Sequence, residues 1–328
     1  MRHINILDGS MGQYCIDKGI PQNNSIWSAY GLQHKQYHSI IIDAHKEYIK
    51  AGSNIITTNN YAVQPNYYRK NFIDWQERII EDTKTAIELA LIAKYETQFS
   101  IKSNIFIFGC LPPICETHRP DLTNKFIKKE GKEFCVNYYK IICNIFKNYN
   151  IDGLLAESMN NWNKVLLVIE ACKDLNIPLI ISMEGALRNN KLKPCAFTSY
   201  KIAEKIIDMK KQGILIDGFG FNCAPPEEIY TALQTLKLSN QLSILNELGI
   251  KLIAYANCND RKIIHDNGFD ISNINNTAIY MRSDLKDFGY IKWCKKFIDI
   301  GVDYCGGCCG CTPREIEKLS LLYNNTNY

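Results

Sequence analysis

The sequence lacks any long uninterrupted hydrophobic run. Its N-terminal apolar stretch, Ile4–Leu7, meets the polar motif Asp8-Gly9-Ser10 at once and is too short for a signal peptide. No other stretch approaches the length of a membrane span. We therefore expect a chain that is neither exported nor inserted in a membrane, and we place it in the cytoplasm.

A block of charge of one sign is also missing. The 38 basic and 34 acidic residues give a net charge of +4, and both signs are spread along the chain. A nucleic-acid or membrane-surface partner would call for a basic stripe or run, and none is visible. The charge pattern therefore gives no support to either class of partner, and the oligomeric state is not indicated by the sequence.

Phosphate-binding glycine motifs and clustered histidines are absent too. Residues 8–12, Asp-Gly-Ser-Met-Gly, fit neither GxGxxG nor GxxxxGK[ST], which argues against an open doubly wound nucleotide-binding sheet. The six histidines lie in expected helices, loops or the N-terminus, which disfavours a zinc hydrolase with histidine and carboxylate ligands. Cysteine, in contrast, occurs 14 times, and without a secretory signal this indicates reduced thiols, metal ligands or core residues.

Short apolar runs that alternate with longer helical patterns are the main feature of the chain. Repeated βα units of this kind predict a parallel sheet, and eight of them suggest a closed (β/α)8 barrel. The expected strands are Ile4–Asp8, Asn54–Asn59, Ile105–Cys110, Gly153–Glu157, Leu179–Met183, Ile216–Cys223, Lys251–Ala256 and Val302–Gly307. The expected helices include Trp75–Tyr95, Phe126–Tyr149, Asn161–Leu175, Thr198–Gln212, Leu285–Gly301 and Pro313–Tyr323.

We see no linker and assign residues 1–328 to one α/β barrel domain. Two connections, 111–125 and 257–284, are long, and long loops in a compact domain are usually binding loops or lids. Polar and reactive residues gather where the expected strands end, and these ends share one rim of a barrel, where such enzymes place their active sites.

The motif Gly306-Gly307-Cys308-Cys309-Gly310-Cys311 is the sharpest local signal. Glycines allow a tight fold in which both sulfurs of Cys308 and Cys309 face one point. Three protein ligands would hold zinc with a fourth position open, and Cys223 at the end of the sixth strand provides a third sulfur. Rival ligands are Cys258, Cys311, Cys110 and Cys305; a closed four-cysteine site made with Cys258 or Cys311 would indicate a structural zinc and a regulatory or binding role instead.

Two acidic residues are candidates for ligand binding. Asp8 and Glu157 each follow an apolar run at the end of an expected strand, where a helix cap or surface charge is the alternative. Backbone N–H groups of Gly9 and Ser10 are placed to receive a ligand carboxylate. Together these groups suit a zwitterionic amino acid. Asn222 and Asn257 are weaker candidates, for which orienting the backbone or loops is the alternative.

On these residues the chain resembles the homocysteine S-methyltransferase family over nearly its whole length. The similarity rests on the segments 7–12 (LDGSMG), 51–61 (AGSNIITTNNY), 154–158 (LLAES), 220–223 (GFNC) and 306–313 (GGCCGCTP). It implies that Cys223, Cys308 and Cys309 bind Zn²⁺, and that Asp8 and Glu157 hold the ammonium group of homocysteine. Departures from the family pattern are Ser158, where Thr is frequent, and Cys258.

The resemblance implies methyl transfer to the homocysteine thiolate, which gives methionine. Zinc removes the thiol proton, and a site with three protein thiolates keeps the bound sulfur nucleophilic, so no further general base is needed. As methyl donor we favour a small sulfonium such as S-methylmethionine, with S-adenosylmethionine as the alternative, because the chain ends with the eighth helix and the segment 25–29 resembles the branch that uses S-methylmethionine. Trp27 or Tyr61 is expected to face the cation, and packing under a loop is the alternative for Trp27.

Overall fold

Eight parallel strands form the centre of the molecule: β1 (Asn5–Ile6), β2 (Ile55–Thr57), β3 (Phe106–Leu111), β4 (Gly153–Met159), β5 (Leu179–Glu184), β6 (Gly218–Asn222), β7 (Lys251–Ala256) and β8 (Tyr304–Gly307). The computed structural model describes residues 4–22, 25–101, 103–115, 120–184, 195–259, 282–286 and 288–324. The strand order is β1-β8-β7-β6-β5-β4-β3-β2, so every strand lies beside its neighbours in the sequence and β1 pairs with β8. This is the order of a (β/α)8 barrel.

The barrel closes between β1 and β2 by sparse contacts. A single parallel bridge joins Leu7 to Ile55. Beside it, the backbone N–H of Asn54 donates to the Ile6 oxygen (2.9 Å), and the Ile6 N–H donates to the Asn54 side-chain oxygen (2.6 Å). A side-chain amide thus takes the place of a backbone partner and completes the ring at a point where the strands are short.

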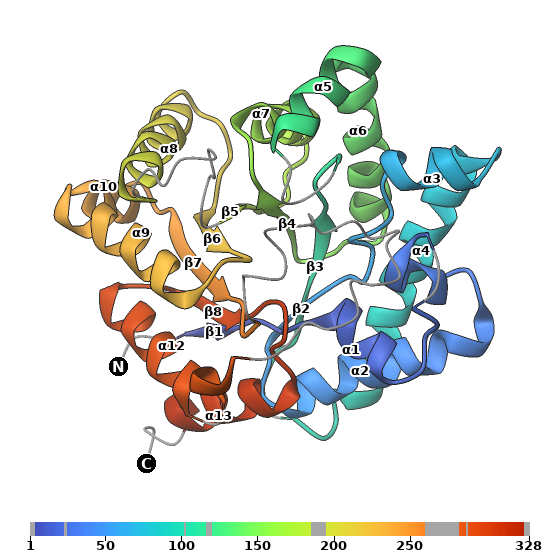
Figure 1. Ribbon diagram of the computed structural model, residues 1–328, viewed down its shortest axis with the longest axis horizontal. Helices are drawn as coiled ribbons and strands as arrows, with labels where there is room; N and C mark the ends of the chain where they lie inside the picture. Colours follow the sequence, from blue (N-terminus) through green and yellow to red (C-terminus); the bar gives the residue numbers. More distant parts are fainter. Residues whose placement is uncertain are drawn as a thin grey trace.

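Helices surround the ring of strands (Figure 1). The α-helices are α1 (Met11–Asp17), α2 (His38–Lys50), α3 (Pro65–Asn71), α4 (Trp75–Thr97), α5 (Pro120–Glu130), α6 (Lys132–Asn148), α7 (Trp162–Cys172), α8 (Cys195–Lys211), α9 (Pro226–Leu238), α10 (Gln241–Glu247), α12 (Gly289–Ile300) and α13 (Pro313–Asn324). Short 3₁₀ turns are η1 (Trp27–Gly31), η2 (Lys35–Tyr37) and η3 (Ser283–Leu285).

Alternation along the strands divides the core into two buried clusters. Side chains on one face of the strands fill the barrel interior; they are Leu7, Ile55, Phe108, Leu155, Ile180, Ile253 and Tyr255. Side chains on the other face pack against the helices in one larger cluster. The interior is therefore filled by bulky side chains, and the space for a ligand lies above it at the rim.

All eight predicted strands are confirmed, although their bounds differ at one or both ends except in β7. The helix expected at 126–149 is wrong as a single element, because Gly131 has φ +89° and separates α5 from α6. The helix expected from Leu285 begins later, at Gly289, after the turn η3. Within the two long connections, residues 116–119 and 260–281 lie outside the described residues.

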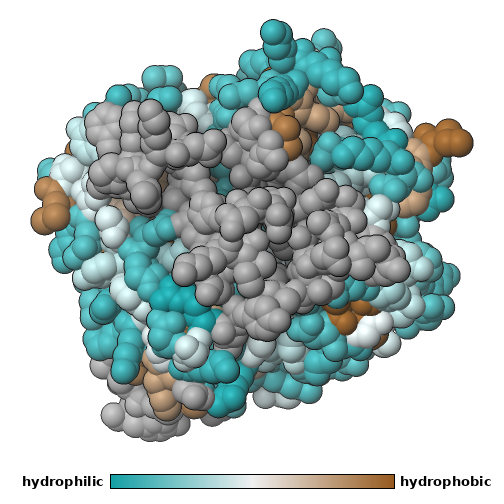
Figure 2. All heavy atoms as spheres, in the orientation of Figure 1, coloured by the Kyte–Doolittle hydropathy of each residue, from teal (hydrophilic) through white to brown (hydrophobic). Residues whose placement is uncertain are grey.

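The coloured part of the face in Figure 2 is mainly hydrophilic, and its hydrophobic residues occur in small separate groups. Scattered exposed hydrophobic side chains of this kind are normal on a protein surface. Within the described ranges, no helix has both the length and the apolar character that a membrane crossing requires.

Candidate functional site

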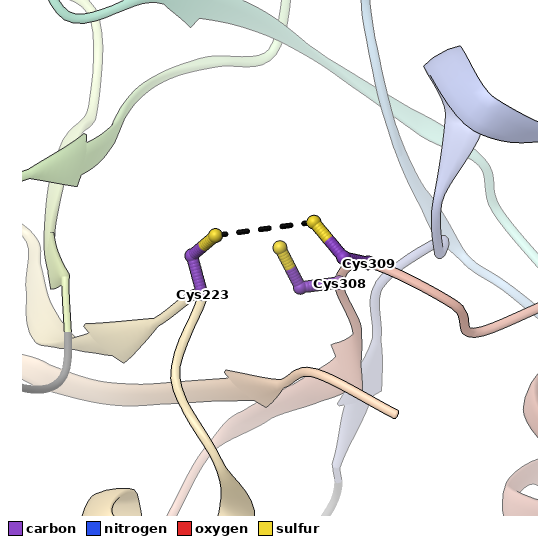
Figure 3. Close-up of side chains that lie close together, drawn as sticks. All are labelled: Cys223, Cys308 and Cys309. Carbon is purple, nitrogen blue, oxygen red and sulfur yellow. Dashed lines mark hydrogen bonds between the residues drawn. The ribbon is translucent and has the colours of Figure 1, made fainter. Parts of the chain in front are cut away.

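Three cysteines converge at the rim of the barrel. Cys223 directly follows β6, and Cys308 and Cys309 directly follow β8. Their sulfur atoms all lie within 4.8 Å of one another, and the Cys223 and Cys309 sulfurs are 4.0 Å apart. Figure 3 shows the three side chains turned toward a common space. Cys223 has φ +52°, a left-handed conformation that turns the chain as it leaves the strand.

Asn257, just beyond β7, contacts both halves of this cluster. Its side-chain N–H₂ donates to the Cys223 sulfur (3.8 Å), and its side-chain oxygen accepts from the Cys309 backbone N–H (3.2 Å). The residue is buried and lies between the two segments that carry the sulfurs. Asn257 therefore holds Cys223 and Cys309 relative to each other, which is possible because β6 and β8 flank β7.

The geometry of the three sulfurs suits zinc. Tetrahedral zinc with bonds of about 2.3 Å to sulfur places its thiolates about 3.8 Å apart, close to the 4.0 Å observed between Cys223 and Cys309. The neighbouring Cys223 sulfur, together with burial, raises the pKa of the Cys308 and Cys309 thiols. Thiols held so close resist losing their protons together unless a cation lies between them, and three sulfur ligands are a donor set that zinc accepts.

The rival cysteines have other partners. Cys258 and Cys311 are fully buried and their sulfurs lie 3.0 Å apart, so these two contact each other. Cys110 donates its thiol proton to Glu157 (3.0 Å), and Cys305 is buried within β8. In the described part of the chain, Cys223, Cys308 and Cys309 form the one group of this kind that could hold a metal ion. A closed four-cysteine site is not what this arrangement favours.

Asp8 and Glu157 line the same pocket as the three cysteines. Asp8 follows β1 and accepts the Thr57 backbone N–H (2.8 Å), which anchors it to β2. Burial, and the negative charge of Glu157, raise the pKa of Asp8 to about 8. Burial also raises the pKa of Glu157 to about 7, with a contribution from nearby Cys223. Two carboxyl groups that resist ionising alone are suited to a bound cation such as an ammonium group.

Gly9 and Ser10 also line the pocket, but the backbone of Ser10 is already occupied. Its N–H donates to the Cys311 oxygen (2.9 Å), so in this structure it is not free to receive a ligand carboxylate. Gly9 lies against the same segment: a Cβ atom there would be 2.4 Å from the Cys311 oxygen. The two residues therefore pack the start of the chain against the turn that carries Cys308 and Cys309.

Asn222 lies at the end of β6, as expected, and its side chain makes hydrogen bonds within the protein. Its side-chain oxygen accepts from the Ser158 N–H (3.0 Å) and the Ser182 hydroxyl (2.9 Å), and its N–H₂ donates to the Ser158 hydroxyl (2.8 Å). These bonds join β6 to β4 and β5 and use the side chain within the protein. Asn222 is fully buried and positions Ser158, which itself lines the pocket.

An aromatic wall completes the pocket on the side of β2 and η1. The rings of Trp27 and Tyr61 line the pocket with centroids 6.5 Å apart in an edge-to-face arrangement. Asn59 and Asn259 line it as well; both are buried, and their side-chain nitrogens have no hydrogen-bond partner among the described residues. Sequence reasoning missed both asparagines, since an unpaired N–H is visible only in three dimensions.

Comparisons with known proteins show the family of the chain. The family model described as homocysteine S-methyltransferase matches residues 5–322. Homocysteine S-methyltransferase 3 of Zea mays is 22% identical over 97% of this chain and 90% of the relative. A betaine-homocysteine S-methyltransferase of Drosophila melanogaster is 23% identical over 88% of this chain and 84% of its own.

Among solved structures, the metallated form of the homocysteine methyltransferase MmuM from Escherichia coli superposes with a TM-score of 0.69. That match has 17% sequence identity and covers 98% of this chain and 96% of the other, and it supports the fold. Since the family model spans nearly the whole chain, the protein belongs to the homocysteine S-methyltransferase family and is a methyltransferase.

Proposed function

We propose that this enzyme transfers a methyl group from a sulfonium donor to the thiolate of homocysteine, and that Cys223, Cys308 and Cys309 hold the zinc ion the reaction uses. The observation that carries the proposal is that three converging sulfurs and the carboxyl groups of Asp8 and Glu157 share one pocket at the barrel rim. A thiol amino acid needs both features, because its sulfur requires activation and its ammonium group requires a negative partner.

Zinc, when bound, lowers the pKa of a substrate thiol so that it reacts as a thiolate near neutral pH. The protein supplies the rest. Asp8 and Glu157 bind the homocysteine ammonium and so fix the direction in which its sulfur points. Asn257 keeps Cys223 and Cys309 in place. Holding the sulfur and the methyl carbon in line then supplies much of the acceleration.

The proposed reaction balances without an added acid or oxidant. The homocysteine sulfur forms a bond to the methyl carbon, and the bond from that carbon to the donor sulfur breaks. Its electron pair stays on the donor, which leaves as a neutral thioether, and the thiol proton of homocysteine is released to solvent. Opposite charges disappear as the bond forms, and a pocket with apolar walls favours that change.

S-methylmethionine is the donor we favour, with S-adenosylmethionine as the alternative. Trp27 and Tyr61 present aromatic rings to the pocket, and a sulfonium over such a ring gains roughly 0.5–2 kcal/mol. A zinc hydrolase is disfavoured, because none of the three described histidines, His34, His38 and His45, lines this pocket.

The test is steady-state kinetics of the zinc-loaded enzyme with homocysteine and one donor at a time: S-methylmethionine, S-adenosylmethionine, betaine, methylcobalamin and methyltetrahydrofolate. We expect methionine to form fastest with S-methylmethionine and to require zinc. If betaine exceeds both sulfoniums, or only the cobalamin or folate serves, the donor assignment is refuted. If no donor yields methionine, homocysteine is not the acceptor.

A further inference from the structure

Asn59 has a buried side-chain amide that lacks one of its expected partners. The residue follows β2 and is 4% exposed. Its side-chain oxygen accepts from the Ser28 hydroxyl (3.3 Å), whereas its nitrogen has no partner in the described ranges. An unpaired buried donor is costly, and in native proteins it usually has a purpose. Because Asn59 lines the pocket, the natural partner for its N–H₂ group is a ligand.

The surroundings of Asn59 place that ligand beside the aromatic wall. Asn59 lies two residues before Tyr61, and its partner Ser28 directly follows Trp27. Both rings line the pocket together with Asn59. Asn59 therefore lies on the side of the pocket where the proposed function puts the methyl donor.

The other residues of the pocket indicate which chemical group of a ligand Asn59 binds. No lysine or arginine is among the described residues that line the pocket, so an anion there has no cationic side chain to meet. Asp8 and Glu157 supply acceptors for an ammonium, but a carboxylate needs donors, and Ser10 has its N–H committed to Cys311. An asparagine N–H₂ group is a neutral donor that binds a carboxylate without neutralising the carboxyl pair.

We propose that Asn59 is a specificity-determining residue that binds the carboxylate of the methyl donor through its side-chain N–H₂ group. The donor is then an onium compound that carries a carboxylate group, and small onium ions without one are poor substrates. This inference rests on the proposed function, since it assumes that the aromatic wall faces the donor.

The test compares two donors that share one sulfonium group: S-methylmethionine and its carboxamide, S-methylmethioninamide. We expect the wild-type enzyme to prefer the carboxylate donor. Asn59→Ala should lower kcat/KM for that donor by roughly 10- to 100-fold, the range for one hydrogen bond to a charged group, and should change the carboxamide donor little. Asn59→Asp should reverse the preference, because its carboxylate repels one donor and accepts from the amide of the other.

Asn259→Ala is the matched comparison. Asn259 is a second buried asparagine of the same pocket with an unpaired side-chain nitrogen, but it follows β7 and not β2. Its substitution should leave the ratio of kcat/KM for the two donors unchanged. Circular dichroism and zinc content of each variant establish that the fold and the metal site are intact.

Three results would overturn the inference. An equal loss with both donors in Asn59→Ala would mean a structural role. A wild-type enzyme that does not distinguish the donors would mean that the carboxylate is not bound. If Asn59→Ala raised only the KM for homocysteine, Asn59 would bind the methyl acceptor and not the donor. Should the wild-type enzyme turn over no donor, the proposed function fails, and calorimetric binding of the two sulfoniums to wild-type and Asn59→Ala protein still tests the role of Asn59.

Discussion

Replacing Asn257 by alanine should weaken metal binding while leaving all three sulfur ligands in place. The change removes the contact to the Cys223 sulfur (3.8 Å) and the partner of the Cys309 N–H (3.2 Å). Each such bond contributes about 0.5–1.5 kcal/mol net, so the pair contributes about 1–3 kcal/mol. This agrees with the roughly 10- to 100-fold losses of metal affinity that follow removal of groups that orient metal ligands.

Competition with a chromophoric zinc chelator measures this loss directly as a change in the zinc Kd. The zinc Kd of Asn257→Asp tests the same contact in a second way. This variant keeps an acceptor for the Cys309 N–H but puts a negative charge beside the Cys223 sulfur, so it should weaken zinc binding more than alanine does. Asn246→Ala, on the exposed side of α10, is the control and should bind zinc like the wild type.

The reasoning is refuted if Asn257→Ala binds zinc within about twofold of the wild type, a difference well below one hydrogen bond, while Cys308→Ser loses it. The same conclusion follows if Asn257→Asp binds zinc more tightly than Asn257→Ala. In either case the three sulfurs hold their positions without the amide, and the packing of β6 and β8 alone orders the site.

Further predictions concern the cysteines and the carboxyl pair. Cys223→Ser and Cys308→Ser should each lose zinc, measured by metal analysis, from about one ion per chain in the wild type; full retention in both would contradict the ligand assignment. Asp8→Asn and Glu157→Gln should each weaken homocysteine binding by roughly 1.5–3 kcal/mol with zinc retained, as calorimetry would show. The pKa values of Asp8 and Glu157 are raised to about 8 and about 7, so the affinity for methionine, whose thioether does not titrate, should increase as pH rises through this range. In Asp8→Asn the increase in affinity near pH 8 should be lost. With its folded pKa raised from 3.8, Asp8 should also make the ligand-free protein less stable as pH rises from about 4 to 8, a loss that thermal unfolding should not show in Asp8→Asn.

The barrel was predictable because its signal is repeated. Each buried strand, such as Leu179–Glu184, is a short apolar run, and the helix that follows has a different period. The break at Gly131 was not predicted because the apolar pattern of Phe126–Tyr149 continues across it. Strand ends such as those of β1 also shifted, since hydrogen bonding between strands decides them.

The cysteine site was predictable for a related reason. Cys223, Cys308 and Cys309 end strands, and parallel strands of a barrel bring their ends to one rim. For Ser10 and Asn222 the sequence could not decide between a ligand and an internal partner, because whether a polar group is free or already bonded depends on neighbours distant in sequence. Cys311, more than three hundred residues from Ser10, takes its N–H, and Ser158 and Ser182 take the amide of Asn222.

The sparse junction between β1 and β2 has a mechanical consequence. A barrel opens most readily where the fewest backbone bonds must break, and here the ring is closed by one bridge, the bond from the Asn54 N–H to Ile6 and the Asn54 side chain. Asp8 stands directly beside this junction, whereas Glu157 belongs to β4. An amino acid bound by both carboxyl groups would therefore connect the β1 side of the junction to β4. Amide hydrogen exchange at Ile6 and Asn54 should therefore slow on binding, because the bound substrate stabilises the junction between β1 and β2 against opening.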